Sequence, residues 1–294
     1  MSSDLSGDDL TQAVLDSFAP STEPRLREIL QVVTTHLHSA VKELQLTPGE
    51  LNTAIDFLTQ VGHMCDDTRQ EFVLLSDVLG ISMLVETLND SDDEHVTEAT
   101  VLGPFHMTES PRRELGDEIN MLPGGDPSYI TGRVTDPEGN PIAGAEVDVW
   151  QCNEDGFYDV QQPDVQPAGN GRGIFTTDAD GNFRFRSIVP SHYPIPDDGP
   201  VGKLLGLTGR HPYRPAHVHF MVNAPGFREL TTHIFVADSP YIDSDTVFAV
   251  RGSLVVPFVP TSDAALAAES GLEAPFHHAT IDIVLARDEE ESAA

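Results

Sequence analysis

The first third of the chain carries apolar residues at steps of three and four, the spacing that aligns side chains along one face of an α-helix. Ser21–Pro24 is typical of a helix start, Thr47–Pro48 indicates a second, and a third helix is expected from about Asp67 to Leu88. Asp77 interrupts an apolar stretch of the third helix, and by itself it is interpreted as an outward-facing acid. The apolar stripe of the first helix consists of Leu26, Ile29, Leu30, Val33, Leu37, Val41 and Leu44.

Beyond residue 96 the hydrophobic period changes from about 3.6 to 2, which predicts short strands. The turn sequences Asp136–Asn140 and Asp178–Asn182 each separate two strand patterns, as in β-hairpins. We therefore expect an α+β protein, with a helical region over residues 1–96 and a mostly antiparallel β-sandwich over residues 97–294. The expected strands lie near residues 130–134, 145–150, 175–177, 183–185, 217–222, 231–236, 254–259 and 280–285.

Charge and composition narrow the classes of partner. The chain has 294 residues, and its 48 acidic and 16 basic side chains give a formal charge of −32. Such a surface repels phosphate backbones and anionic lipid, so neither a nucleic-acid-binding nor a membrane protein is expected. The N-terminal segment is acidic rather than signal-like, and the two cysteines, Cys65 and Cys152, suggest no disulfide framework. We expect a cytoplasmic protein.

The strongest local motif is Arg214–Phe220, which reads R-P-A-H-V-H-F. Residues i and i+2 of a strand point to the same face, so His217 and His219 would present their imidazoles side by side. Two imidazoles on a rigid strand make a good half of a metal site. Paired histidines also occur on solvated strand faces, and the motif alone favours neither interpretation.

A metal site would need further ligands, and two kinds are available. Asp238 and Glu229 could supply the carboxylate of an Fe(II) facial triad, although no glutamate follows His219 at the spacing of a cupin site. Tyrosine is the alternative, because ferric iron can hold a phenol as phenolate although the pKa of a free phenol is about 10. The five tyrosines are Tyr129, Tyr158, Tyr193, Tyr213 and Tyr241.

Three segments resemble the intradiol ring-cleavage dioxygenase family: Gly156–Tyr158, Ser187–Tyr193 and Gly209–Phe220. Leu230–Thr232 continues the likeness. The S-I-V-P-x-x-Y and R-P-A-H-V-H-F motifs, in this order and at this separation, are a highly specific combination. The likeness covers most of the chain, because a helical first third followed by a β-rich remainder is also the layout of that family.

The resemblance implies one Fe(III) per subunit, bound by Tyr158, Tyr193, His217 and His219 with hydroxide in a fifth position. Two phenolates and one hydroxide balance the charge of the ion, and phenolate-to-iron charge transfer would colour the protein. A small aromatic diol or triol would bind as a dianion and react with O2. Tyr193 would accept a substrate proton, and Arg214 would stabilise developing negative charge rather than form a mere surface ion pair.

Two further segments, Val101–His106 and Thr231–Phe235, most resemble the hydroxyquinol (benzene-1,2,4-triol) branch of the family. Catechol dioxygenases usually carry Gln in place of His233 and Gly in place of His192. The resemblance gives Asp77 a new interpretation, as the acceptor for the third ring hydroxyl. Chlorocatechol or catechol cleavage is the alternative specificity. The implied substrate-binding residues are Leu74, Asp77, Val101, Leu102, Gly103, Pro104, Phe105, Ile195, Pro196, Arg214, His233 and Val247.

The resemblance also implies a homodimer that forms through the helical region and holds phospholipid at its interface. A different class of protein stays open beside these expectations. The β-rich part could be a transthyretin-like sandwich that binds a ligand without catalysis and has solvated histidines. Iron content and colour would separate these two interpretations.

Overall fold

The computed structural model describes residues 7–67, 69–91, 93–106 and 110–288. The chain divides into two compact units, and the boundary in the sequence lies between Gln60 and Val61. The boundary expected after residue 96, between dimerisation and catalytic regions, stays a prediction. Among the described residues, no helix has the length and hydrophobicity needed to cross a bilayer.

The first unit is helical. It holds α1 (Gly7–Ser17), α2 (Pro24–Leu44) and most of α3 (Pro48–His63), of which α2 and α3 begin at the predicted prolines. α1 contacts α2 through an ion pair of 2.7 Å between Asp8 and the Lys42 ammonium. All seven residues of the predicted α2 stripe are exposed, Leu37 by 60% and Leu44 by 70%.

The third predicted helix is two helices, so the expectation of one continuous helix is wrong. α4 (Glu71–Val78) and α5 (Ile81–Asn89) are separated by Gly80, whose φ of 71° is the left-handed conformation that ends helices. The interpretation of Asp77 as an outward-facing acid is also wrong, because its exposed fraction is 2%.

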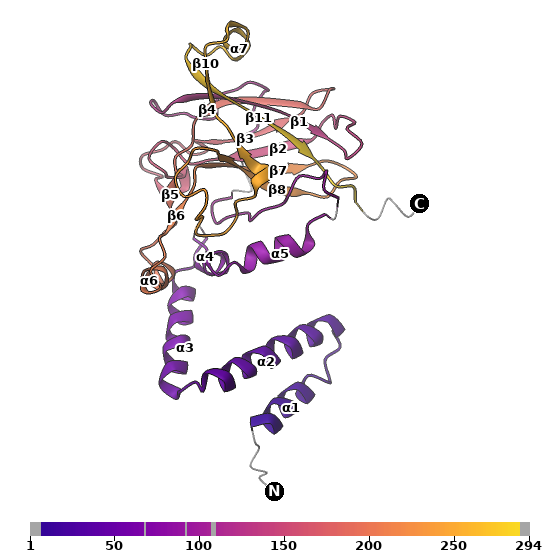
Figure 1. Ribbon diagram of the computed structural model, residues 1–294, viewed down its shortest axis with the longest axis vertical. Coiled ribbons are helices and arrows are strands. Elements are labelled where there is room, and N and C mark those ends of the chain that lie inside the picture. The colour runs from indigo at the N-terminus through magenta and orange to yellow at the C-terminus, as the bar shows by residue number, and fades with distance from the viewer. Residues whose placement is uncertain (1–6, 68, 92, 107–109, 289–294) are drawn as a thin grey trace. The chain divides into compact units, whose positions relative to one another are not determined.

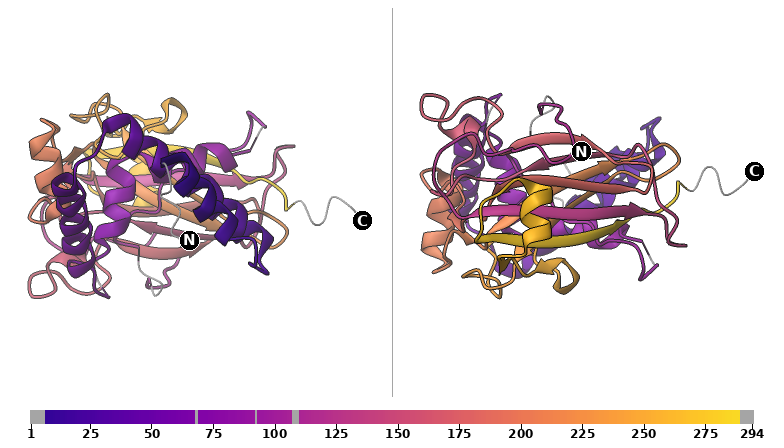
Figure 2. Two further views of the ribbon diagram at one scale, coloured as in Figure 1. Left: turned by 90° about the horizontal axis from the view of Figure 1, so that it is seen from below. Right: turned by 90° about the horizontal axis from the view of Figure 1, so that it is seen from above.

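The second unit is built around two stacked sheets (Figure 1). The four-stranded sheet pairs its strands antiparallel except β1 with β11. Figure 2, in its right panel, shows α7 (Ala264–Ser270) crossing the outer face of this sheet. In spatial order the strands are β10 (Val259–Thr261), β11 (Phe276–Val284), β1 (Pro127–Thr135) and β4 (Asn182–Ile188).

The five-stranded sheet is antiparallel except for its last pair, β8 with β9. The short strands β5 (Tyr193–Pro194) and β6 (Tyr213–Arg214) form a separate ladder, with α6 (Pro200–Leu207) between them in sequence. Two 3-10 turns, η1 (Asp159–Gln161) and η2 (Gly252–Leu254), complete the elements. In spatial order the five strands are β3 (Arg172–Thr176), β2 (Glu146–Trp150), β7 (His217–Asn223), β8 (Leu230–Val236) and β9 (Val255–Val256).

The two predicted hairpins are wrong. β1 and β2 flank the turn at Asp136–Asn140 yet lie in different sheets, and so do β3 and β4 on either side of Asp178–Asn182. Each strand buries one face in the core between the sheets, so the chain crosses from one sheet to the other at both turns. The same tight-turn sequences occur in a hairpin within one sheet and in a connection between two sheets.

Strand β7 shows how the sandwich creates a site. Val218, Phe220 and Val222 are fully buried in the core between the sheets. Because side chains alternate along a strand, His217 and His219 point to the opposite face. They are also buried, with 1% and 2% of their surface exposed, so this outer face of the sheet is covered.

Candidate functional site

Three imidazoles cluster on the outer face of the five-stranded sheet. His217 and His219 come from β7 and His233 from β8, and their candidate ligand atoms all lie within 4.8 Å of one another. His219 and His233 are direct partners in the β7–β8 register, with ring centroids 4.0 Å apart. The two histidines of the sequence motif are therefore brought together as predicted, and a third joins them.

His217 has one nitrogen that is committed to the backbone and one that faces the site. Its Nδ1 donates to the Pro215 carbonyl oxygen at 2.7 Å, so Nε2 carries the lone pair. Burial, reinforced by the nearby Arg214 guanidinium, lowers the pKa of His217 well below its usual value. The imidazole is therefore neutral, which is the form that binds metals.

Two phenols converge on the same nitrogen. The Tyr193 hydroxyl lies 3.4 Å and the Tyr158 hydroxyl 3.5 Å from His217 Nε2, and the two hydroxyls are 3.3 Å apart. Burial raises the pKa of Tyr193 to about 12 and that of Tyr158 also well above its usual value. Both phenols stay protonated at neutral pH although Arg214 is close by, whereas a bound metal ion would favour the phenolates.

The loop that carries Tyr158 is fixed by a buried ion pair. Asp159 accepts from Arg172 Nε and from the Gly169 backbone N–H, both at 2.8 Å. The Tyr158 backbone N–H donates to the Gln161 side chain at 2.8 Å. Arg172 lies on β3, so these contacts fasten the phenol-bearing loop to the edge strand of the sheet that carries the histidines.

The arrangement fits a metal ion. Ligand atoms about 2 Å from a common first-row metal lie about 3–3.5 Å apart, which is the spacing of the three converging atoms of Tyr158, Tyr193 and His217. Nδ1 of His219 is buried and has no hydrogen-bond partner among the described residues, so protein contacts leave that nitrogen uncommitted. Neutral imidazoles and phenols buried together are a donor set for a hard or borderline cation.

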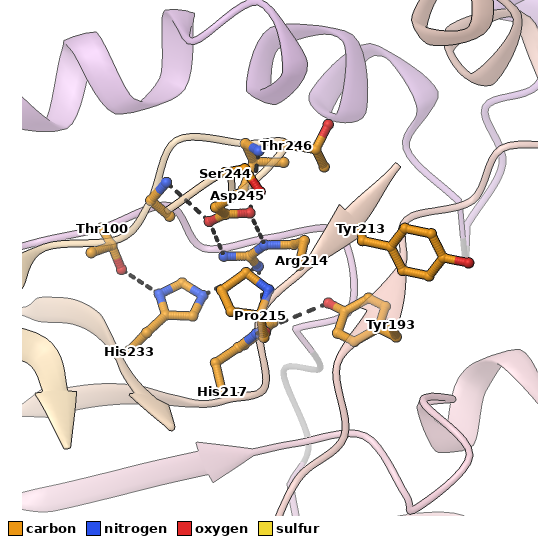
Figure 3. A network of polar contacts seen from close by, with 12 residues as sticks. Thr100, Tyr193, Tyr213, Arg214, Pro215, His217, His233, Ser244, Asp245 and Thr246 are labelled. Atoms are coloured by element: carbon orange, nitrogen blue, oxygen red, sulfur yellow. Dashed lines mark hydrogen bonds and ion pairs between the residues drawn. The ribbon is translucent and has the colours of Figure 1, made fainter. Parts of the chain in front are cut away.

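Arg214 lies beside this cluster and is almost fully buried (Figure 3). The β5–β6 register pairs it with Tyr193, and its Nη1 is 3.2 Å from His217 Nε2 and 3.5 Å from His233 Nε2. Its counterion is Asp245, with Nε 3.2 Å from the carboxylate. A surface ion pair, the competing interpretation of Arg214, is therefore wrong.

Two other residues hold the imidazoles. The Trp150 indole stacks on His219 at a centroid distance of 4.6 Å and an interplanar angle of 11°. The Thr100 hydroxyl is hydrogen-bonded to Nδ1 of His233. Burial lowers the pKa of the His233 imidazole well below its usual value. Neither role is evident from the sequence motifs, although Trp150 is the only tryptophan of the chain and stands at the end of an alternating strand pattern.

Most of the predicted pocket residues are enclosed, but their roles stay predictions. Phe105 stacks on Tyr158 at 4.8 Å, and a Cβ at Gly103 would lie 3.2 Å from the His219 ring, so the backbone there passes close to the imidazole. Leu102 is 41% exposed and also borders a separate cavity with Arg228, so it is the least enclosed of the set. Buried members are Leu74, Asp77, Val101, Phe105, Ile195 and Val247, and half-buried ones are Gly103, Pro104 and Pro196.

Asp77 lies in the electrostatic neighbourhood of the site. Burial raises its pKa, and the further influences on that pKa are Ser82, Arg214 and Asp245. Leu74 and Asp77 are three residues apart on α4, so they share one face of the helix. Asp77 is thus buried and within the electrostatic influence of Arg214, while its role in binding substrate stays a prediction.

Known protein families match most of this chain. A family model described as dioxygenase matches residues 102–286, and one described as catechol dioxygenase N terminus matches residues 23–97. The chain is 50% identical over 277 residues, 94% of each chain, to a hydroxyquinol 1,2-dioxygenase of Rhizobium sp.. The chain belongs to the intradiol ring-cleavage dioxygenase family.

Solved structures of intradiol dioxygenases share its fold. A hydroxyquinol 1,2-dioxygenase from Pseudomonas putida matches with a TM-score of 0.87 and 44% identity, over 96% of this chain and 99% of its own. A catechol 1,2-dioxygenase from Acinetobacter sp. matches with a TM-score of 0.84 and 31% identity, over 96% and 92%. The predicted fold class and the predicted enzyme class are both confirmed. A carrier without catalysis is not favoured.

Proposed function

We propose that this intradiol dioxygenase cleaves hydroxyquinol between its two adjacent hydroxyl-bearing carbons, with O2, to 3-hydroxy-cis,cis-muconate, the enol form of maleylacetate. The observation that carries the choice of substrate is the buried carboxyl of Asp77 near Arg214. The greater identity to hydroxyquinol dioxygenases than to the catechol dioxygenase supports it, at 50% and 44% against 31%.

We propose Tyr158, Tyr193, His217 and His219 as the ligands of one Fe(III) per subunit. The spacing of the Tyr158, Tyr193 and His217 donor atoms supports this set. His233 stays outside it because its Nδ1 is bonded to Thr100 and its Nε2 faces Arg214. When bound, the ferric ion supplies the Lewis acidity that holds both substrate oxygens and the electronic coupling through which the ring reacts with O2.

In the proposed reaction Tyr193 accepts a proton from the substrate, and Arg214 stabilises negative charge that develops on it. Burial raises the pKa of Tyr193 to about 12, so its phenolate oxygen would be a strong base when not bound to a cation, and it would accept one substrate proton. Arg214 Nη1 points at the site from a fully buried position, where a fixed cation stabilises developing negative charge without rearrangement.

The pocket walls select a flat ring with a third hydroxyl. Leu74, Val101, Phe105, Ile195 and Val247 offer apolar surface. Asp77 supplies a polar contact at this wall, and burial raises its pKa more than its hydrogen bond with Ser82 and the charge of Arg214 lower it. A site built around such a group penalises a substrate that lacks the matching hydroxyl.

Asp77→Ala is expected to lower kcat/KM for hydroxyquinol while affecting catechol less. A lost hydrogen bond to a charged group is worth about 1.5–3 kcal/mol, so selectivity should fall by about one to two powers of ten. Catechol serves as the internal control, because it has both chelating hydroxyls and lacks the third. If both diols lose activity equally, Asp77 supports the fold rather than selecting the substrate.

The substrate assignment is tested by comparing kcat/KM for hydroxyquinol and catechol with the wild-type protein, and by identifying the product by mass spectrometry. We expect hydroxyquinol to be cleaved much better and to give the hydroxymuconate. A preference for catechol or a chlorocatechol would move the protein to another branch of the family and leave the proposed iron site intact.

We propose that the protein is a homodimer joined through its helical region. The exposed apolar stripe of α2 supports this, and α5 adds Leu84 and Leu88, which are 58% and 74% exposed. Exposed apolar rows on helices are typical of an obligate symmetric interface, and such an interface could also enclose phospholipid. Light scattering at micromolar concentration should give twice the mass of 31.9 kDa, and mass spectrometry of an organic extract should detect the lipid. A monomeric mass would contradict the dimer.

We propose a cytoplasmic location. Cys65 and Cys152 are both free, and Cys152 is buried, where burial raises the pKa of its thiol to about 12. Unpaired thiols, of which the buried Cys152 is unreactive, suit a reducing compartment.

A further inference from the structure

We propose that Asp245 is the positioning residue for Arg214: its carboxylate fixes the direction in which the guanidinium meets the substrate, and the same carboxylate holds the loop that carries Val247. This inference rests on the proposed role of Arg214. Asp245 belongs to no motif identified in the sequence and touches neither the phenols nor the imidazoles through any contact in the described part of the chain.

The first observation is a two-point ion pair. Arg214 Nε lies 3.2 Å from Asp245 Oδ1 and Nη2 lies 3.3 Å from Oδ2, so the planar guanidinium meets the planar carboxylate edge to edge (Figure 3). Both side chains are almost fully buried, with exposed fractions of 3% and 2%. A two-point contact of this kind fixes orientation as well as distance.

The second observation is that the pair leaves one guanidinium nitrogen for the site. With Nε and Nη2 engaged by Asp245, Nη1 is directed toward the imidazoles of His217 and His233, at 3.2 and 3.5 Å. Rotation of the guanidinium would move Nη1 away from this position. Asp245 therefore decides where the positive charge lies as well as keeping it paired.

The third observation concerns the loop. The two Asp245 oxygens also accept backbone N–H groups, Oδ1 from Val247 at 3.3 Å and Oδ2 from Ala249 at 3.1 Å. The loop is bracketed by Tyr241 and Phe248, whose φ values of 69° and 61° are rare for bulky residues. Such conformations persist only where surrounding contacts impose them, and the Asp245 carboxylate does so at Phe248 by accepting the N–H groups of Val247 and Ala249 on either side.

The first experiment is Asp245→Asn, with Asp243→Asn as the matched control. Both substitutions replace a carboxylate by an amide on one loop, but Asp243 is exposed. We expect Asp245→Asn to lower kcat for hydroxyquinol by about 10–100-fold, as for residues that orient a catalytic group, with iron content and the resting visible spectrum unchanged. Asp243→Asn should stay within about twofold of wild type. A normal kcat in Asp245→Asn would overturn the proposal.

A double-mutant cycle separates positioning from a general structural role. If Asp245 acts through Arg214, then adding Asp245→Asn to Arg214→Ala should change kcat by less than about threefold. Losses that multiply would overturn the proposal, because they would show an effect independent of Arg214. Should Asp245→Asn alone fail to fold, a folded double variant would support the pairing, since the buried cation would have caused the failure. A double variant that also fails to fold would contradict it.

Failure of this inference differs from failure of the proposed function. If Arg214→Ala alone retains normal turnover, the proposed role of Arg214 falls and the inference falls with it. If Arg214→Ala is impaired while Asp245→Asn is not, only the positioning role of Asp245 is wrong.

Discussion

Tyr158→Phe and His217→Ala are expected to lose bound iron or to shift its absorption, and to lose nearly all activity. Each substitution removes an atom from the group that converges within 3.3–3.5 Å. The remaining donors would leave an incomplete coordination shell around the ion. The measurements are iron per subunit, the visible spectrum, and tryptophan fluorescence, because the only tryptophan, Trp150, stacks on His219 and should be quenched when the metal is bound.

Tyr129→Phe and His278→Ala are matched controls for these two substitutions. Both residues lie in the four-stranded sheet, away from the imidazole cluster; Tyr129 donates to Glu269 and His278 is hydrogen-bonded to Thr131. The controls should keep full iron content and the wild-type visible band. Full occupancy and an unchanged band in both Tyr158→Phe and His217→Ala would overturn the four-ligand proposal.

Arg214→Ala is expected to keep iron and colour while turnover falls by about 10²–10³, the usual cost of removing a preorganised charge-stabilising group. The effect should lie mainly in kcat, because the guanidinium acts on charge that develops during the reaction. The substitution also leaves Asp245 buried without its cation, which should lower the free energy of unfolding by about 3–5 kcal/mol. Turnover is therefore measured well below the melting temperature of the variant.

Arg287→Ala is the control for Arg214→Ala. Arg287 is also ion-paired, to Asp136 at 2.6 Å, but 54% of its side chain is exposed. Its loss should leave kcat near the wild-type value. Turnover close to normal in Arg214→Ala would reduce Arg214 to a structural partner of Asp245.

Much of the fold can be predicted from local patterns. The prolines at positions 24 and 48 mark the starts of α2 and α3, and period-two hydrophobicity locates β1, β2, β7 and β8. Which strands pair with each other is harder to predict from local sequence patterns. The turns after β1 and β3 look like hairpin turns, yet each carries the chain between sheets, because burial against a common core decides the pairing.

The candidate site likewise contains residues that can be predicted from the sequence and residues that cannot. His217 and His219 are predictable because two residues on one strand share a face whatever the rest of the fold does. Asp245 is not, since it lies 31 residues after Arg214 and only the folded chain shows their ion pair. Asp77 depends on tertiary structure too: its local sequence allows a surface acid, and only the packing of α4 buries it. Helix α4 itself ends early because Gly80 adopts a left-handed conformation.

The central claim is that two tyrosines and two histidines hold a ferric ion that binds the triol directly. It is tested by the visible spectrum of the iron-loaded protein before and after anaerobic addition of hydroxyquinol. We expect a phenolate-to-iron charge-transfer band that shifts when the triol binds and, in the proposed arrangement, displaces Tyr193. An iron-loaded protein without a visible band, or a band that saturating hydroxyquinol leaves unchanged, would contradict the account.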